Sequence, residues 1–134
     1  MKKITTIIAF FSILLGQFSD PAEFKFNISN ANQGEVVILE VQAQIEKDWH
    51  IYAIYDVPEG PEPTVINVSS SQVVKTGKVI EPEPIVTYDE GFDNITKYHE
   101  GNPLFKVPII IEKNLPNGLY SFDVTVQYQV CTGN

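Results

Sequence analysis

The sequence predicts an all-β protein, an immunoglobulin-like antiparallel β-sandwich, and three observations support this prediction. Apolar and polar residues alternate along several segments, as they do in strands that cover a core with one face. Turn-forming clusters separate these segments, and nine prolines are spread through the chain. No long segment repeats at the helical period. Short strands at this spacing are typical of an antiparallel sandwich.

The N-terminus has the pattern of a secretory signal peptide, which we place at residues 1–19. Two lysines precede an uncharged apolar segment from Ile4 to Gly16, and Ser19 is the expected small residue at the cleavage site. The apolar segment is short for a membrane span, although a membrane anchor is the alternative. We therefore expect residues 20–134 to form one exported domain.

The first two predicted strands alternate clearly. Phe24, Phe26 and Ile28 share one face of the first strand. The second strand carries five apolar residues on its core face: Val37, Leu39, Val41, Ala43 and Ile45. Shorter β-rich segments follow, and turn-forming sequences such as "PEGPEP", "EPEP" and "NLPNG" separate them. These segments cover residues 64–69, 72–80 and 104–111.

The segment "LYSFDVTVQYQV" predicts one long last strand. Its core face would carry Tyr120, Phe122, Val124, Val126, Tyr128 and Val130. Cys131 has the parity of the polar face, so its thiol is expected to point away from the core. The alternative is a buried and inert cysteine. Turn-forming residues follow Cys131, so we expect a returning strand and a second cysteine beyond Asn134.

The charge of the chain excludes some partners. Seven lysines and seventeen acidic residues follow position 19, which gives a net charge of about −10, and the chain contains no arginine. An acidic domain of this kind is a poor binder of nucleic acid or of an anionic membrane. Export also implies an oxidising compartment, where a single cysteine is either an intermolecular partner or a reactive thiol.

Two segments concentrate aromatic residues. "DWHIYAIYDVPEGPEPT" contains Trp49, His50, Tyr52 and Tyr55, which could form a core corner, a ligand platform or an interface. "YDEGFDNITKYHEGN" is predicted to be a polar loop. Its phenylalanine, Phe92, either packs back onto the domain or covers another group, and a solvated connector is the alternative.

The sequence contains no convincing metal or hydrolase site. His50, His99 and Cys131 could converge on a metal, but no close ligand spacing such as C-x-x-C or H-x-x-x-H is present. The G-x-S-x-G motif of serine hydrolases is missing as well. We therefore predict neither a metal nor another cofactor.

Four segments in order, "DWHIYAIYDVPEGPEPTVI", "GKVIEPEP", "YHEGNPLFKVPI" and "VQYQVC", resemble the N-terminal periplasmic domain of the DsbD family of protein-disulfide reductases. The resemblance covers about residues 24–131. It implies an immunoglobulin-like fold that performs thiol–disulfide exchange without a cofactor. It also implies electron transfer from a membrane redox domain of the same polypeptide to periplasmic disulfide isomerases and thioredoxin-like proteins of cytochrome c maturation.

The resemblance also suggests the site residues. Cys131 matches the first cysteine of the family's redox pair, and the second is expected a few residues later. Phe92 matches the aromatic residue of a loop that caps the pair, with Asp89 and Glu90 beside it, although Gly91 is an extra residue in that loop. Two further residues fall where the family has aromatic side chains near the site, namely His50 and Tyr52.

Two other hypotheses remain open from the sequence. The domain could be an immunoglobulin-like adhesion or carbohydrate-binding module that uses the aromatic residues between Trp49 and Tyr55, with Cys131 incidental. It could also be a purely structural exported domain. A cysteine shortly after Asn134 in the gene would favour the redox hypothesis.

Overall fold

The computed structural model describes residues 20–75 and 77–133, and all its regular elements are β-strands. The predicted signal peptide lies outside the described residues. Within those residues, no helix is long and apolar enough to cross a membrane. The ten strands are β1 (Ala22–Ile28), β2 (Val36–Ile45), β3 (Trp49–Tyr52), β4 (Val65–Ser69), β5 (Val73–Lys75), β6 (Ile85–Asp89), β7 (Asn94–His99), β8 (Leu104–Ile111), β9 (Asp123–Gln127) and β10 (Val130–Thr132).

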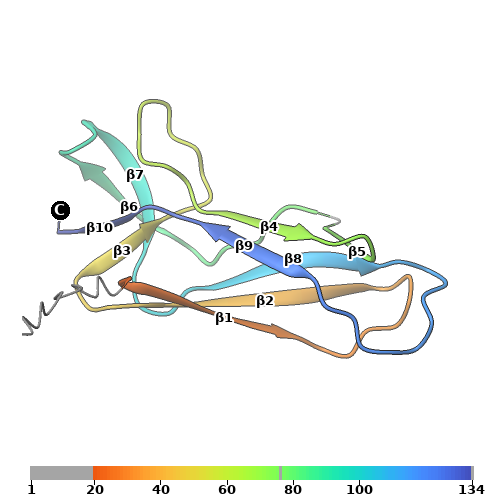
Figure 1. The fold of residues 1–134 in the computed structure, drawn as a ribbon. Coiled ribbons are helices and arrows are strands. Elements are labelled where there is room, and N and C mark those ends of the chain that lie inside the picture. Colours follow the sequence, from red (N-terminus) through yellow and green to blue (C-terminus); the bar gives the residue numbers. More distant parts are fainter. Residues whose placement is uncertain (1–19, 76, 134) are drawn as a thin grey trace, which may run out of the picture.

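The strands form antiparallel sheets that pack as a sandwich, which confirms the predicted fold class (Figure 1). One sheet has the order β1-β2-β8-β5, a second has the order β10-β3-β7-β6, and β4 pairs with β9 in a third. All pairings in these sheets are antiparallel. The sheets therefore arise from pairings between segments that are mostly far apart in the chain.

The core follows the predicted alternation of β2. Leu39, Val41, Ala43 and Ile45 are buried, and Val37 packs against them at the edge. The core contains further buried side chains from β8, which pairs with β2, and from the other two sheets, namely Phe105, Val107, Ile109, Ile51 and Ile66. Since β2 and β8 lie at the centre of their sheet, removal of these side chains from water is the main stabilising contribution to the fold.

The last predicted strand is divided in two. β9 ends at Gln127 and β10 begins at Val130. At the break, the Gln129 side-chain oxygen accepts a hydrogen bond from the Glu62 backbone nitrogen at 2.7 Å. The predicted core face is otherwise correct from Phe122 to Val130, but Tyr120 lies before β9 and is 45% exposed. The prediction of one continuous strand with Tyr120 in the core was therefore wrong.

The predicted polar loop of residues 88–102 is mostly a β-hairpin. Strands β6 and β7 pair from Ile85↔Tyr98 to Asp89↔Asn94, and only residues 90–93 form the turn. The hairpin projects beyond the sandwich at the end where β10 lies (Figure 1). β3 was also missed as a strand, whereas the predicted strand at 72–80 is reduced to β5.

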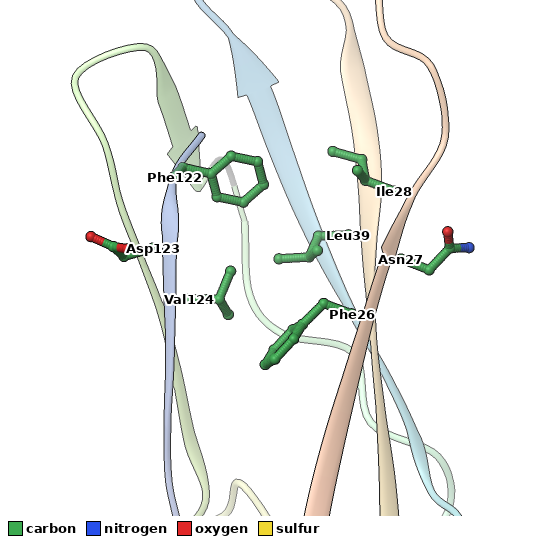
Figure 2. A pocket seen from close by; sticks show the side chains of 7 residues that line it. All are labelled: Phe26, Asn27, Ile28, Leu39, Phe122, Asp123 and Val124. Atoms are coloured by element: carbon green, nitrogen blue, oxygen red, sulfur yellow. The ribbon is translucent and has the colours of Figure 1, made fainter. Parts of the chain in front are cut away.

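An apolar groove lies between β1 and β9. Phe26, Leu39, Phe122 and Val124 point into it, while Asn27 and Asp123 point away (Figure 2). Its volume is about 250 Å³. Phe26 is 48% exposed, so the first predicted strand has the expected alternation but leaves part of its apolar face uncovered.

Candidate functional site around Cys131

Cys131 lies in β10, directly opposite His50 of β3. Its neighbour Val130 pairs with Ile51 and packs against the core. Because successive side chains of a strand point to opposite faces, Cys131 lies on the face away from Val130, together with His50 and Tyr52. The thiol is free and half-buried. The alternation in the sequence therefore predicted the orientation of the cysteine correctly.

His50 is buried between two tyrosines. Its ring centroid is 4.5 Å from that of Tyr98 and 5.1 Å from that of Tyr52, to which it is nearly perpendicular. The His50 Nε2 atom is buried and has no hydrogen-bond partner among the described residues. Burial lowers the pKa of His50 below its usual 6.5, although the charges of Glu100 and Asp89 oppose this effect. The imidazole beside Cys131 is therefore neutral at pH 7.

Tyr52 connects β3 to the β6–β7 hairpin. Its side chain is almost fully buried, and its hydroxyl donates a hydrogen bond of 3.0 Å to Asp89 Oδ2. Burial, the hydrogen bond to Asp89 and the proximity of Cys131 all raise the pKa of Tyr52 well above its usual value. The phenol consequently stays protonated and remains a hydrogen-bond donor beside the thiol.

The turn of the hairpin packs on Tyr52. The Phe92 ring meets the Tyr52 ring edge to face, with the centroids 5.9 Å apart. The other carboxylate oxygen of Asp89 accepts a hydrogen bond of 2.9 Å from the Gly91 backbone nitrogen, which fixes the start of the turn. Gly91, the extra residue in the comparison with the capping loop, therefore has a defined place in this turn. Glu90 is exposed in the same turn.

The predicted site residues thus divide into three groups. His50, Tyr52, Asp89 and Phe92 form a connected cluster around β3, with Cys131 on the adjacent strand. Glu90 borders this cluster at the surface. His99, the remaining candidate metal ligand, pairs with Ile51 and packs against Phe105, so it faces the other side of the sheet.

The arrangement provides one thiol in an aromatic setting. Thiol–disulfide exchange requires a thiolate with access to a partner disulfide, and a half-buried cysteine on the last strand has that access from one side. Among the described residues, no group of three or more His, Cys, Asp or Glu side chains is arranged to hold a metal ion.

The chain matches the family model described as thiol:disulfide interchange protein DsbD, N-terminal, over residues 17–134. The chain belongs to this family. The DsbD N-terminal domains are periplasmic domains for thiol:disulfide interchange with thioredoxin-like redox partners. Comparisons with curated proteins and with solved structures gave no significant match. Membership in this family does not favour the alternative hypothesis, a binding module in which Cys131 is incidental.

One part of the DsbD-type domain was not predicted from the sequence. Glu81 Oε2 and His99 Nε2 lie 2.9 Å apart, within hydrogen-bond distance, close to the base of the β6–β7 hairpin. Only the acidic and proline-rich sequence "EPEP" pointed to this region, and it gave no indication of the histidine 18 residues later.

Proposed function

We propose that this domain passes reducing equivalents to periplasmic disulfide proteins and that Cys131 is its attacking thiol. The electrons would come from a membrane redox domain of the same full-length polypeptide. The recipients would be thioredoxin-like proteins and disulfide isomerases. The observation that carries the proposal is the position of Cys131, half-buried on β10 and opposite His50, in a chain of the DsbD N-terminal family.

The proposed exchange has two steps. The Cys131 thiolate attacks one sulfur of the partner's disulfide, so that the partner's S–S bond breaks and a mixed disulfide forms. The released partner sulfur leaves as a thiolate and takes up a proton. A second thiol, which the family leads us to expect a few residues after Cys131, would then attack the Cys131 sulfur and release the reduced partner. The domain would be left with an intramolecular disulfide.

We assign the tip of the β6–β7 hairpin the role of a cap over this site. Phe92 covers Tyr52 on the face that also carries Cys131, and the hydrogen bond from Tyr52 to Asp89 holds the tip down. An exposed thiol in an oxidising compartment is open to unwanted oxidants, so a cap would restrict access to partners that displace it. His50 and Tyr52 would form the floor of the same site.

A displacement assay tests the proposed role of Cys131. A thioredoxin-like protein with a single active-site cysteine is loaded with thionitrobenzoate, and release of the coloured anion reports attack by Cys131. We expect a one-to-one protein adduct with this chain and none with the Cys131→Ser variant.

An unrelated protein that carries the same label on a surface cysteine is the control for nonspecific exchange. If the folded chain forms no adduct while the urea-unfolded chain reacts with the disulfide reagent dithiobis(nitrobenzoate), Cys131 is inert in the fold and the proposal fails. Equal rates with the unrelated protein would also contradict it, since they would show a reactive thiol without partner recognition.

A further inference from the structure

A partly buried carboxylate, that of Glu81, joins three segments at the base of the β6–β7 hairpin. Glu81 Oε2 accepts a hydrogen bond of 3.0 Å from the Ile54 backbone nitrogen, and the same oxygen lies 2.9 Å from His99 Nε2. The side chains of His99 and Glu81 are 3% and 16% exposed. Ile54 follows β3 and His99 ends β7, so one oxygen atom of Glu81 links β3 to the β6–β7 hairpin.

The Glu81–His99 contact is also anchored to β8, which belongs to the other four-stranded sheet. Ile80, the residue before Glu81, exchanges two backbone hydrogen bonds with Lys106 of β8, at 2.8 and 2.9 Å. The His99 ring packs edge to face on Phe105 of β8, with a centroid distance of 5.4 Å. Since β8 is a central strand of its sheet, Glu81 is held at a rigid part of the molecule.

A stiff connection leads from Glu81 to the hairpin. The sequence Glu81-Pro82-Glu83-Pro84 enters β6 directly at Ile85. The ring of each proline fixes its φ angle, and the residue before each proline is restricted to extended conformations. Glu81 and Glu83 are therefore restricted to extended backbone and both prolines have a fixed φ, so the place of Glu81 restricts where β6 begins.

The hairpin has few other attachments to the sheet that it extends. The register of β3 and β7 comprises only Ile51↔His99 and Tyr52↔Tyr98 within the described residues. One more backbone hydrogen bond, from Ala53 to Lys97, follows these pairs. At its tip, the hairpin is held by the contacts of Asp89 and Phe92 with Tyr52 and by a hydrogen bond of 3.4 Å from Asn94 Nδ2 to the Pro58 carbonyl oxygen. Lys97 of β7 also lies over the Tyr55 ring, 4.4 Å from its centroid. The position of the tip depends on these few contacts and on how firmly the base is fixed.

We propose that Glu81 is a positioning residue for the exchange site, which fixes the base of the β6–β7 hairpin so that Phe92 and Asp89 stay on Tyr52 beside Cys131. The importance of this positioning for thiol–disulfide exchange rests on the function proposed above. The positioning itself concerns only the access of reagents to the thiol, and it is measured without a redox partner.

The test is the rate at which iodoacetamide alkylates Cys131 in the folded protein. Glu81→Ala leaves the Ile54 nitrogen and His99 without their shared acceptor, and we expect alkylation to accelerate about tenfold, as the loss of a hydrogen bond to a charged group allows. Glu81→Gln keeps a carbonyl oxygen for Ile54, so its rate should remain within about twofold of the original chain.

Two further variants separate positioning from general loosening. In a Phe92→Ala background the tip no longer covers Tyr52, so Glu81→Ala should add little further acceleration if it acts through the tip. Leu39→Ala weakens the core at the groove between β1 and β9 and should leave the alkylation rate unchanged at a similar loss of stability. If Glu81→Ala does not fold, His99→Phe replaces it, because this change removes Nε2 but keeps a ring against Phe105.

An unchanged rate in a folded Glu81→Ala or His99→Phe variant would overturn the inference. The inference would also be overturned if Glu81→Ala accelerated alkylation equally in the original chain and in the Phe92→Ala background. Failure of the displacement assay alone, with these alkylation results as expected, would refute the proposed redox function and leave the positioning role of Glu81 intact.

Discussion

Replacement of Tyr52 by phenylalanine should reveal how strongly the hairpin tip is held. The ring is almost fully buried and contacts His50 and Phe92, and phenylalanine preserves this packing. The change removes one hydrogen bond of 3.0 Å to the Asp89 carboxylate. A hydrogen bond to a charged group contributes about 1.5–3 kcal/mol. Because Asp89 is only half-buried and water can replace the hydroxyl, we expect a loss of about 1 kcal/mol in the free energy of unfolding.

The assay is urea unfolding of a double-mutant cycle with Asp89→Ala. If the two side chains act together, the double variant should be about 1 kcal/mol more stable than the sum of the single losses predicts. Tyr88→Phe is the matched control, because the Tyr88 hydroxyl bonds Asp93 at an exposed position, and its loss should be below about 0.5 kcal/mol. Additive losses for Tyr52→Phe and Asp89→Ala would refute the idea that this bond fastens the tip.

Three further predictions concern the cap, the histidine and the core. Phe92→Ala should accelerate alkylation of Cys131 by a small reagent, and an unchanged rate would remove its capping role. Burial lowers the pKa of His50, so the unfolded chain binds the proton more readily, and the stability that neutral His50 contributes is complete above about pH 6.5 and decreases below it. His50→Phe should therefore lose less stability than the original chain between pH 7.5 and 5, as measured by urea unfolding. Phe105→Ala should destabilise the domain by about 3–5 kcal/mol in the same assay, because this fully buried ring lies at the centre of a sheet.

The sequence predicted best those features that depend on alternation within one strand. The apolar face of β2 can be recognised in the sequence because apolar and polar residues alternate along a strand that has one buried face. The same rule gave the orientation of Cys131. It failed for β6 and β7, where exposed apolar residues and buried polar ones mix, because Ile95 projects where no second sheet covers it while Thr96 is buried. These strands exist because they pair with each other and with β3, and a pairing partner is not a local property of the sequence.

The contacts around the site were the least predictable part. The sequence and the family resemblance named His50, Tyr52, Asp89 and Phe92, but they did not indicate that Tyr52 connects the other three. This connection depends on the register that places Tyr52 beside Tyr98 and on a hairpin long enough to return over it. The Glu81–His99 pair was missed for a similar reason, since two polar residues in separate segments of the sequence give no sign that their side chains will pack together.

The groove between β1 and β9 has a consequence for how the protein behaves in concentrated solution. Within the described residues β1 pairs only with β2 and β9 only with β4, so each offers a free backbone edge beside apolar side chains. Such edges favour pairing between separate molecules. The formal net charge of −8 makes the molecules repel each other at neutral pH. Acidification neutralises the carboxylates and salt screens their charges. Either treatment should therefore promote self-association, and dilute buffer at neutral pH should keep the chain monomeric.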